Sequence, residues 1–108
     1  MKRMSFVFVL SIAFSLLGLT SCGRFEARML VRQGNDLYNS KKFLEAINKY
    51  KSAVEKAPHL YTIHLNIALS YMALYVPGST HPKDLEYSQK AIDEFKTYLK
   101  YEKDPEMR

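Results

Sequence analysis

Three histidines are the residues of this sequence that most directly suggest metal or acid–base chemistry. His59 and His64 stand five positions apart, and His81 lies in a separate turn-rich stretch. Zinc-binding histidine pairs on a helix are usually four positions apart, and no cysteine or acidic cluster accompanies these three. We therefore interpret them as surface or turn residues and expect no metal site. A small metal-binding protein or enzyme that uses the three histidines is the alternative.

The other polar residues form no pattern that is typical of catalysis. The chain has no glycine-rich phosphate loop, no paired catalytic carboxylates and no nucleophile beside a base. We expect a protein that is not an enzyme, with no catalytic residue and no cofactor.

The N-terminal residues have the three parts of an export signal. Lys2 and Arg3 precede an uncharged stretch of 14 residues over 6–19, which would span roughly 21 Å as a helix. That length is short of the bilayer core of roughly 30 Å but suits the apolar region of a signal peptide. The sequence therefore predicts a signal peptide over residues 1–21.

The segment LTSC over 19–22 resembles the lipobox of bacterial lipoproteins. The resemblance implies cleavage between Ser21 and Cys22, a diacylglycerol on the Cys22 thiol and acylation of the new amino group. It implies a location in the bacterial cell envelope, lipid-anchored at the periplasmic face. Gly23, in place of an aspartate, favours the outer membrane over the inner membrane. The alternative is a scaffold anchored by an uncleaved transmembrane helix over 4–20.

Composition excludes several classes of protein. The net charge of the 108 residues is +5, and it falls to +3 once residues 1–21, with two bases and no acid, are removed. Such a mild positive charge does not indicate a nucleic-acid partner. One cysteine cannot form a disulfide framework, and 47% hydrophobic residues argue against disorder. A single small domain remains.

The rest of the chain contains an internal repeat. Gly34 and Ala68 are 34 positions apart. The segment AINKYKSAV over 46–54 is echoed by AIDEFKTYL over 91–99 at an offset of 45, which implies an 11-residue insertion between the two. The turn-rich segment near 76–83 is where we expect the insertion to lie.

This repeat resembles the tetratricopeptide repeat, in which a pair of helices recurs every 34 residues. The residues that match the family pattern are Gly34, Ala46, Tyr50, Pro58, Ala68, Tyr71, Ala91 and Phe95. The resemblance implies an all-α fold, an α-α superhelix of two helical hairpins that follows the N-terminal signal peptide helix. The implied segments are a lipidated tether over 22–26, repeats over 27–60 and 61–105, and a tail over 106–108.

Local signals place four helices, at about 26–39, 42–56, 61–75 and 83–101. Apolar side chains of the second helix fall on one stripe, made of Ala46, Ile47, Tyr50, Ala53 and Val54. Gly34 lacks bulk, so two helices can approach closely there. Pro58 ends the second helix, and Pro82 with Asp84 fits the start of the fourth. Tyr50, Tyr71 and Tyr98 lie on packing stripes and are expected in the core.

Two asparagines suggest a binding groove. Asn35 and Asn66 are 31 positions apart, on the inner helices of successive hairpins. Some tetratricopeptide domains use two such asparagines, together with Lys and Arg, to hold the carboxylate end of a peptide. Val31 stands where the first Lys of that clamp belongs, so we favour two amides that line a groove without a clamp. The residues expected to line the groove are Arg28, Val31, Asn35, Tyr38, Asn39, Thr62, Leu65, Asn66, Leu69 and Met72.

These features predict a membrane-tethered module for protein–protein interaction, which binds a protein or peptide in the envelope as part of an assembly or secretion complex. Stacked repeats need about three copies for stability, and this chain has two. We therefore expect low stability of the isolated monomer. A partner that completes the stack, a second copy of the chain, or membership of a longer repeat family would each explain the short array.

Overall fold

The structure, a computed structural model, describes residues 22–106. The predicted signal peptide over 1–21, which includes Ser21, and the last two residues of the predicted tail lie outside the described residues. Residues 22–106 are helical with turns and contain no strand, which confirms the all-α prediction.

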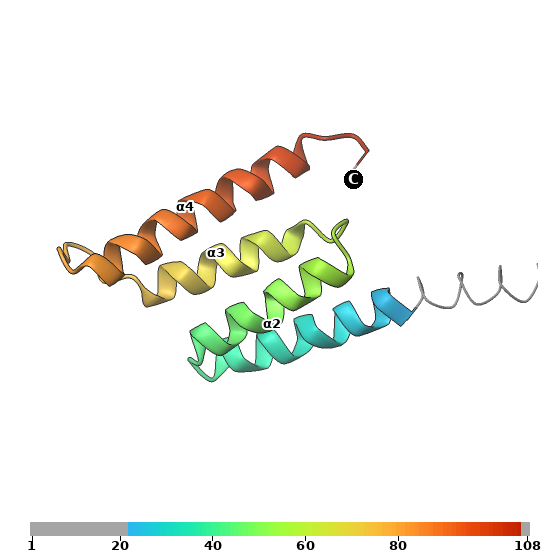
Figure 1. Cartoon of the computed structure of the whole chain (residues 1–108), viewed down its shortest axis with the longest axis horizontal. Coiled ribbons are helices and arrows are strands. Elements are labelled where there is room, and N and C mark those ends of the chain that lie inside the picture. Colours follow the sequence, from blue (N-terminus) through green and yellow to red (C-terminus); the bar gives the residue numbers. More distant parts are fainter. Residues whose placement is uncertain (1–21, 107–108) are drawn as a thin grey trace, which may run out of the picture.

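Four helices follow one another in this part of the chain. They are a first helix over 22–39, α2 (Phe43–Lys56), α3 (Thr62–Leu74) and α4 (Pro82–Glu102). Consecutive helices run in opposite directions, with α3 between α2 and α4 and the first helix beside α2 (Figure 1). Apart from the start of the first helix, every predicted helix end lies within one residue of the observed one.

The first helix begins earlier than predicted, because residues 22–26, expected as a tether, are already helical. This turn is held against the C-terminal end of α2. Lys56 Nζ forms an ion pair with Glu26 Oε2 at 2.6 Å, and Ala27 is fully buried. Gly23 also lies beside this end of α2: a Cβ atom there would stand 3.5 Å from the Lys56 carbonyl oxygen, an ordinary contact. The sequence pattern missed these contacts because they join residues that are far apart in the chain.

A tight turn joins the first helix to α2. Lys41 has a φ of 62°, in the left-handed region, and Lys42 N–H donates to the Leu37 carbonyl at 2.9 Å. This hydrogen bond closes the end of the first helix in the manner of a Schellman motif. The next turn contains Pro58, which follows the C-cap residue Ala57 of α2 as predicted for a helix stop.

The predicted insertion is only partly a loop. Ala46 is the fourth residue of α2, whereas its counterpart Ala91 is the tenth residue of α4. More than half of the 11 inserted residues therefore lengthen α4 at its N-terminus. The start of α4 is fixed by Pro82 in the first turn and by the His81 ring, which accepts a hydrogen bond from Lys83 N–H. These signals start the helix well before the repeat pattern resumes.

The core lies between α2 and α3 and is shared with the first helix. Its largest fully buried side chains include Tyr50 of α2 and Ile63 and Ile67 of α3. Four of the five residues in the predicted α2 stripe are buried, and Val54 packs against them. α4 contributes only Ala91 as a fully buried residue, because α3 covers one side of it and no described element covers the other. Tyr98, expected in the core, is half-buried against the ring of Tyr61 at 5.8 Å.

Candidate functional site

A hollow of about 220 Å³ opens where the first helix, α2 and α3 meet. We call it the groove. It is lined by Asn35, Tyr38, Tyr50, Asn66 and Leu69.

The helical period explains why these residues converge. Asn35 and Tyr38 are three positions apart on the first helix, and Asn66 and Leu69 are three positions apart on α3, so each pair shares a face. The opposite face of α3 is buried in the core. The two pairs therefore face the groove from neighbouring helices.

Tyr50 links the core to the groove. Its ring is buried, while its hydroxyl donates a 2.7 Å hydrogen bond to Asn35 Oδ1. Burial, and secondarily the neighbouring Tyr38, raise the pKa of Tyr50 above its usual value of 10.0. The hydroxyl therefore stays protonated at neutral pH and keeps the Asn35 carbonyl oriented.

This hydrogen bond leaves polar groups available in the groove. Asn35 Nδ2 still carries two N–H donors, and the side-chain amide of Asn66 offers both donors and an acceptor. Neither group has a hydrogen-bond partner among residues 22–106. None of the five lining side chains is charged. The groove is suited to a neutral ligand that both donates and accepts hydrogen bonds, as a peptide main chain does.

Four of the ten predicted groove residues line the groove: Asn35, Tyr38, Asn66 and Leu69. The others lie elsewhere on the first helix and α3. Arg28, Asn39, Thr62 and Met72 are exposed, and Val31 and Leu65 are half-buried. Sequence reasoning assigned Tyr50 to the core and missed its place in the groove. The available signal was its phenol, since a buried tyrosine hydroxyl needs a hydrogen-bond partner.

The three histidines do not meet. His64 Nδ1 lies 2.7 Å from Glu94 Oε2, so this histidine joins α3 to α4 in a partly buried pair. His81 caps α4, beyond the other end of α3, and His59 is exposed in the turn before α3. In the part of the chain that the structure describes, no three histidine, cysteine or acidic side chains are grouped so that they could hold a metal ion.

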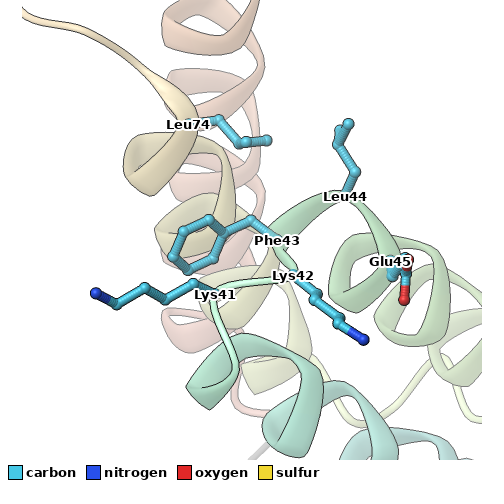
Figure 2. A pocket seen from close by; sticks show the side chains of 6 residues that line it. All are labelled: Lys41, Lys42, Phe43, Leu44, Glu45 and Leu74. Atoms are coloured by element: carbon cyan, nitrogen blue, oxygen red, sulfur yellow. The ribbon is translucent and has the colours of Figure 1, made fainter.

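Two further hollows lie outside the groove. One, of about 240 Å³, is lined by Lys41, Lys42, Phe43, Leu44, Glu45 and Leu74. Figure 2 shows that Lys41 and Lys42 extend away from each other, which leaves mainly apolar side chains around it. The other hollow has a similar volume and is lined by Phe25, Glu26, Met29, Leu30, Gln33 and Lys56.

Cys22, the predicted lipid attachment site, is an exposed free cysteine in the first turn of the described chain. Its thiol is open to modification. None of the helices within residues 22–106 combines the length and apolar character that crossing a membrane requires.

Comparisons of the chain with protein-family models, curated proteins and solved structures found no match. What the site can bind must therefore follow from its own geometry and chemistry.

Proposed function

We propose that this protein is a membrane-tethered interaction module whose groove binds a protein or peptide segment in the bacterial envelope. The observation that carries the proposal is the meeting of two side-chain amides in one uncharged hollow: Asn35, whose Nδ2 donors are free while Tyr50 holds its Oδ1, and Asn66, whose side chain has no partner among residues 22–106. Asparagine side chains at this position can hydrogen-bond an extended peptide backbone as neighbouring peptide groups would. Binding of this kind needs no chemical turnover.

The groove also has an apolar part. Tyr38 and Leu69 stand beside the two amides, one on each of the facing helices. Aromatic and aliphatic anchors supply much of the affinity of peptide-binding surfaces, whereas main-chain hydrogen bonds fix the register of the peptide. The expected ligand is an extended segment that places an apolar side chain between Tyr38 and Leu69.

The proposed architecture is a short tetratricopeptide superhelix. The antiparallel order of the four helices and the close contact at Gly34 support it. An exposed apolar row on α4, made of Leu85, Ile92 and Leu99, is where a third hairpin would stack in such an array. A longer stack, a second copy or the bound partner would cover this row.

The proposed anchor is lipid on Cys22, and intact mass tests it directly. Expressed in a bacterial host, the wild-type chain should lose residues 1–21 and gain the mass of acyl chains. Cys22→Ala should retain residues 1–21 and carry no lipid. An uncleaved transmembrane anchor would leave both chains at full length and without lipid, so that their masses would differ only by the substitution.

Site-specific photocrosslinking in the native host tests the groove. A photoreactive residue at Leu69 should crosslink to one discrete partner, whereas the same residue at Glu45, exposed on α2, should not. Asn66→Ala should weaken the crosslink from position 69 without unfolding the chain, because the Asn66 side chain makes no hydrogen bond within residues 22–106. Equal crosslinking from positions 69 and 45 would contradict the groove as the binding site.

A further inference from the structure

The outer face of the first helix carries three arginines and two large apolar side chains. Arg24, Arg28 and Arg32 recur every four residues, and Phe25 and Met29 stand next to them in the sequence. All five side chains are exposed, Phe25 to 67% and Met29 to 40%. We call this set the outer face.

Helical geometry places the five side chains together. At 3.6 residues per turn they fall within about 140° of the helix circumference. Ala27, Leu30 and Gly34 occupy the opposite side of the same helix, where they meet the core. The outer face therefore lies on the side of the first helix away from these core contacts. Its apolar edge borders α2, because Phe25 and Met29 line one hollow with Lys56. Asn35 falls within the same arc, so the row of arginines leads toward the rim of the groove.

The positive charge of the outer face is not neutralised within the described chain. Glu26, the acid between the first two arginines, is paired with Lys56 at 2.6 Å. Among residues 22–106, none of the three guanidinium groups forms an ion pair. Asp36 stands one turn beyond Arg32, at the far end of the row. A row of arginines without ion pairs attracts an extended surface that carries many negative charges.

We propose that the outer face docks on a bilayer that contains anionic phospholipids. Guanidinium groups bind phosphate oxygens in bidentate fashion, and an exposed Phe and Met beside them can enter the boundary between headgroups and acyl chains. This combination of bases and large apolar side chains is typical of helices that lie in the membrane interface, and it distinguishes a lipid surface from a purely polar anionic partner.

The position of the outer face fits a membrane contact. Cys22 stands two residues before Arg24 on the same helix, so the proposed lipid anchor and the outer face lie at one end of the chain. The first helix forms one edge of the layer of helices and α4 the other (Figure 1). Docking would hold the first helix along the bilayer and leave α4 on the far side. The inference rests on the proposed membrane tether.

A tryptophan reporter tests the contact, because the natural chain contains no tryptophan. The full chain with Phe25→Trp is reconstituted in vesicles of phosphatidylcholine, alone or mixed with phosphatidylglycerol. We expect blue-shifted emission and quenching by brominated lipid on the mixed vesicles, and much less of both on phosphatidylcholine alone. Leu85→Trp, at an exposed position of α4, is the matched control, and its tryptophan emission should be the same on both kinds of vesicle.

Charge removal tests the role of the arginines. A triple variant in the Phe25→Trp background replaces the three arginines by Arg24→Gln, Arg28→Gln and Arg32→Gln. Each base near an anionic surface raises the ratio of docked to undocked chains roughly fivefold, so the triple variant should lower that ratio about 100-fold. Lys96→Gln, Lys100→Gln and Lys103→Gln remove the same charge from exposed positions near the end of α4 and should leave quenching unchanged. Circular dichroism checks that each variant remains helical.

The outcomes separate the docking from the tether. A chain that does not associate with vesicles at all would overturn both proposals. A chain that associates while the reporter at position 25 stays in water would overturn the docking alone, as would quenching that persists on the mixed vesicles after the three arginines are removed.

Discussion

Gly34 of the first helix lies against the ring of Tyr50 in α2, so closely that a Cβ atom at position 34 would fall 2.6 Å from Tyr50 Cε1. The ring is buried, and its hydroxyl is held by Asn35, the neighbour of Gly34. One contact therefore sets both the spacing of the first hairpin and the orientation of an amide in the groove.

Gly34→Ala should destabilise the protein, although alanine is the better helix former. The new methyl group would overlap the Tyr50 ring, and overpacking of a buried site costs about 1–3 kcal/mol. The gain in helix propensity is about 1 kcal/mol, so the clash outweighs it. Urea unfolding should show a net loss of up to about 2 kcal/mol.

Gly23→Ala is the matched control for this prediction. A Cβ atom at position 23 would lie 3.5 Å from the Lys56 carbonyl oxygen, which is an ordinary contact. This variant should be unchanged or more stable by up to about 1 kcal/mol. A stabilising effect of alanine at both glycines would show that the Tyr50 contact does not constrain the hairpin.

Lys41→Gly should stabilise the protein. Lys41 adopts a φ of 62°, where a side chain is disfavoured by about 1 kcal/mol and glycine is not. Lys42, with a φ of −93°, provides the control, because Lys42→Gly removes the same charge and relieves no strain. We expect a higher midpoint of thermal unfolding for Lys41→Gly and an unchanged or lower one for Lys42→Gly. The opposite order would contradict the left-handed turn.

The helix ends could be predicted from the sequence because they depend on local signals. Each of these signals acts within a few residues of the chain. Pro58 follows the end of α2, Pro82 begins α4, and the predicted stripe around Tyr50 is the buried face of α2. The early start of the first helix could not be predicted, because the contact between Glu26 and Lys56 joins positions 30 apart.

The groove could be predicted only in part, for the same reason. A 34-residue period makes Leu69 the counterpart of Asn35, and Asn66 shares a helix face with Leu69, three positions later. The structure places all three in the groove. The period does not specify how far the residues beside Asn35 and Asn66 are buried. Val31 and Leu65 were expected to face a ligand, but they are half-buried, and Val31 packs against the core.

Alkaline pH should destabilise the protein through Tyr50. Its pKa is raised in the folded state, so the folded protein holds the phenolic proton more tightly than the unfolded chain does. The contribution is fully present below the unfolded pKa of about 10 and is lost as the pH rises through the folded pKa. Urea unfolding at about pH 9 and about pH 11 measures this loss.

Two variants isolate this effect. Tyr50→Phe should be less stable than wild type by about 1 kcal/mol at neutral pH, because it loses the hydrogen bond to Asn35, and it should lose less stability at alkaline pH. Asn35→Ala also removes the hydrogen bond but keeps the buried phenol, so the stability of this variant should still fall at alkaline pH. Identical pH profiles for wild type and Tyr50→Phe would refute the assignment.

His64→Ala should destabilise the second hairpin. The imidazole bridges to Glu94 at 2.7 Å and stacks near the Tyr101 ring at 5.9 Å, so its removal leaves a partly buried carboxylate without this partner. Loss of a hydrogen bond to a charged group costs about 1–3 kcal/mol. His59→Ala, at an exposed position, should change stability by no more than about 0.5 kcal/mol. If His64→Ala left stability unchanged and instead abolished tight zinc binding, the side chain would be a metal ligand.

The same substitution should have very unequal effects on stability at equivalent positions of the two repeats. Ile47 and Ile92 occupy the same place in the repeated segment, but Ile47 is 2% exposed and Ile92 is 44% exposed. Ile47→Ala should cost about 2–5 kcal/mol, whereas Ile92→Ala should stay within about 0.5 kcal/mol. The repeat pattern alone predicts equal losses. The difference arises because α2 lies between the first helix and α3, while one side of α4 has no described neighbour.

The free energy of unfolding of both variants, measured over a range of protein concentrations, tests this prediction. A loss at Ile92 that grows with concentration would show instead that a second copy of the chain covers α4.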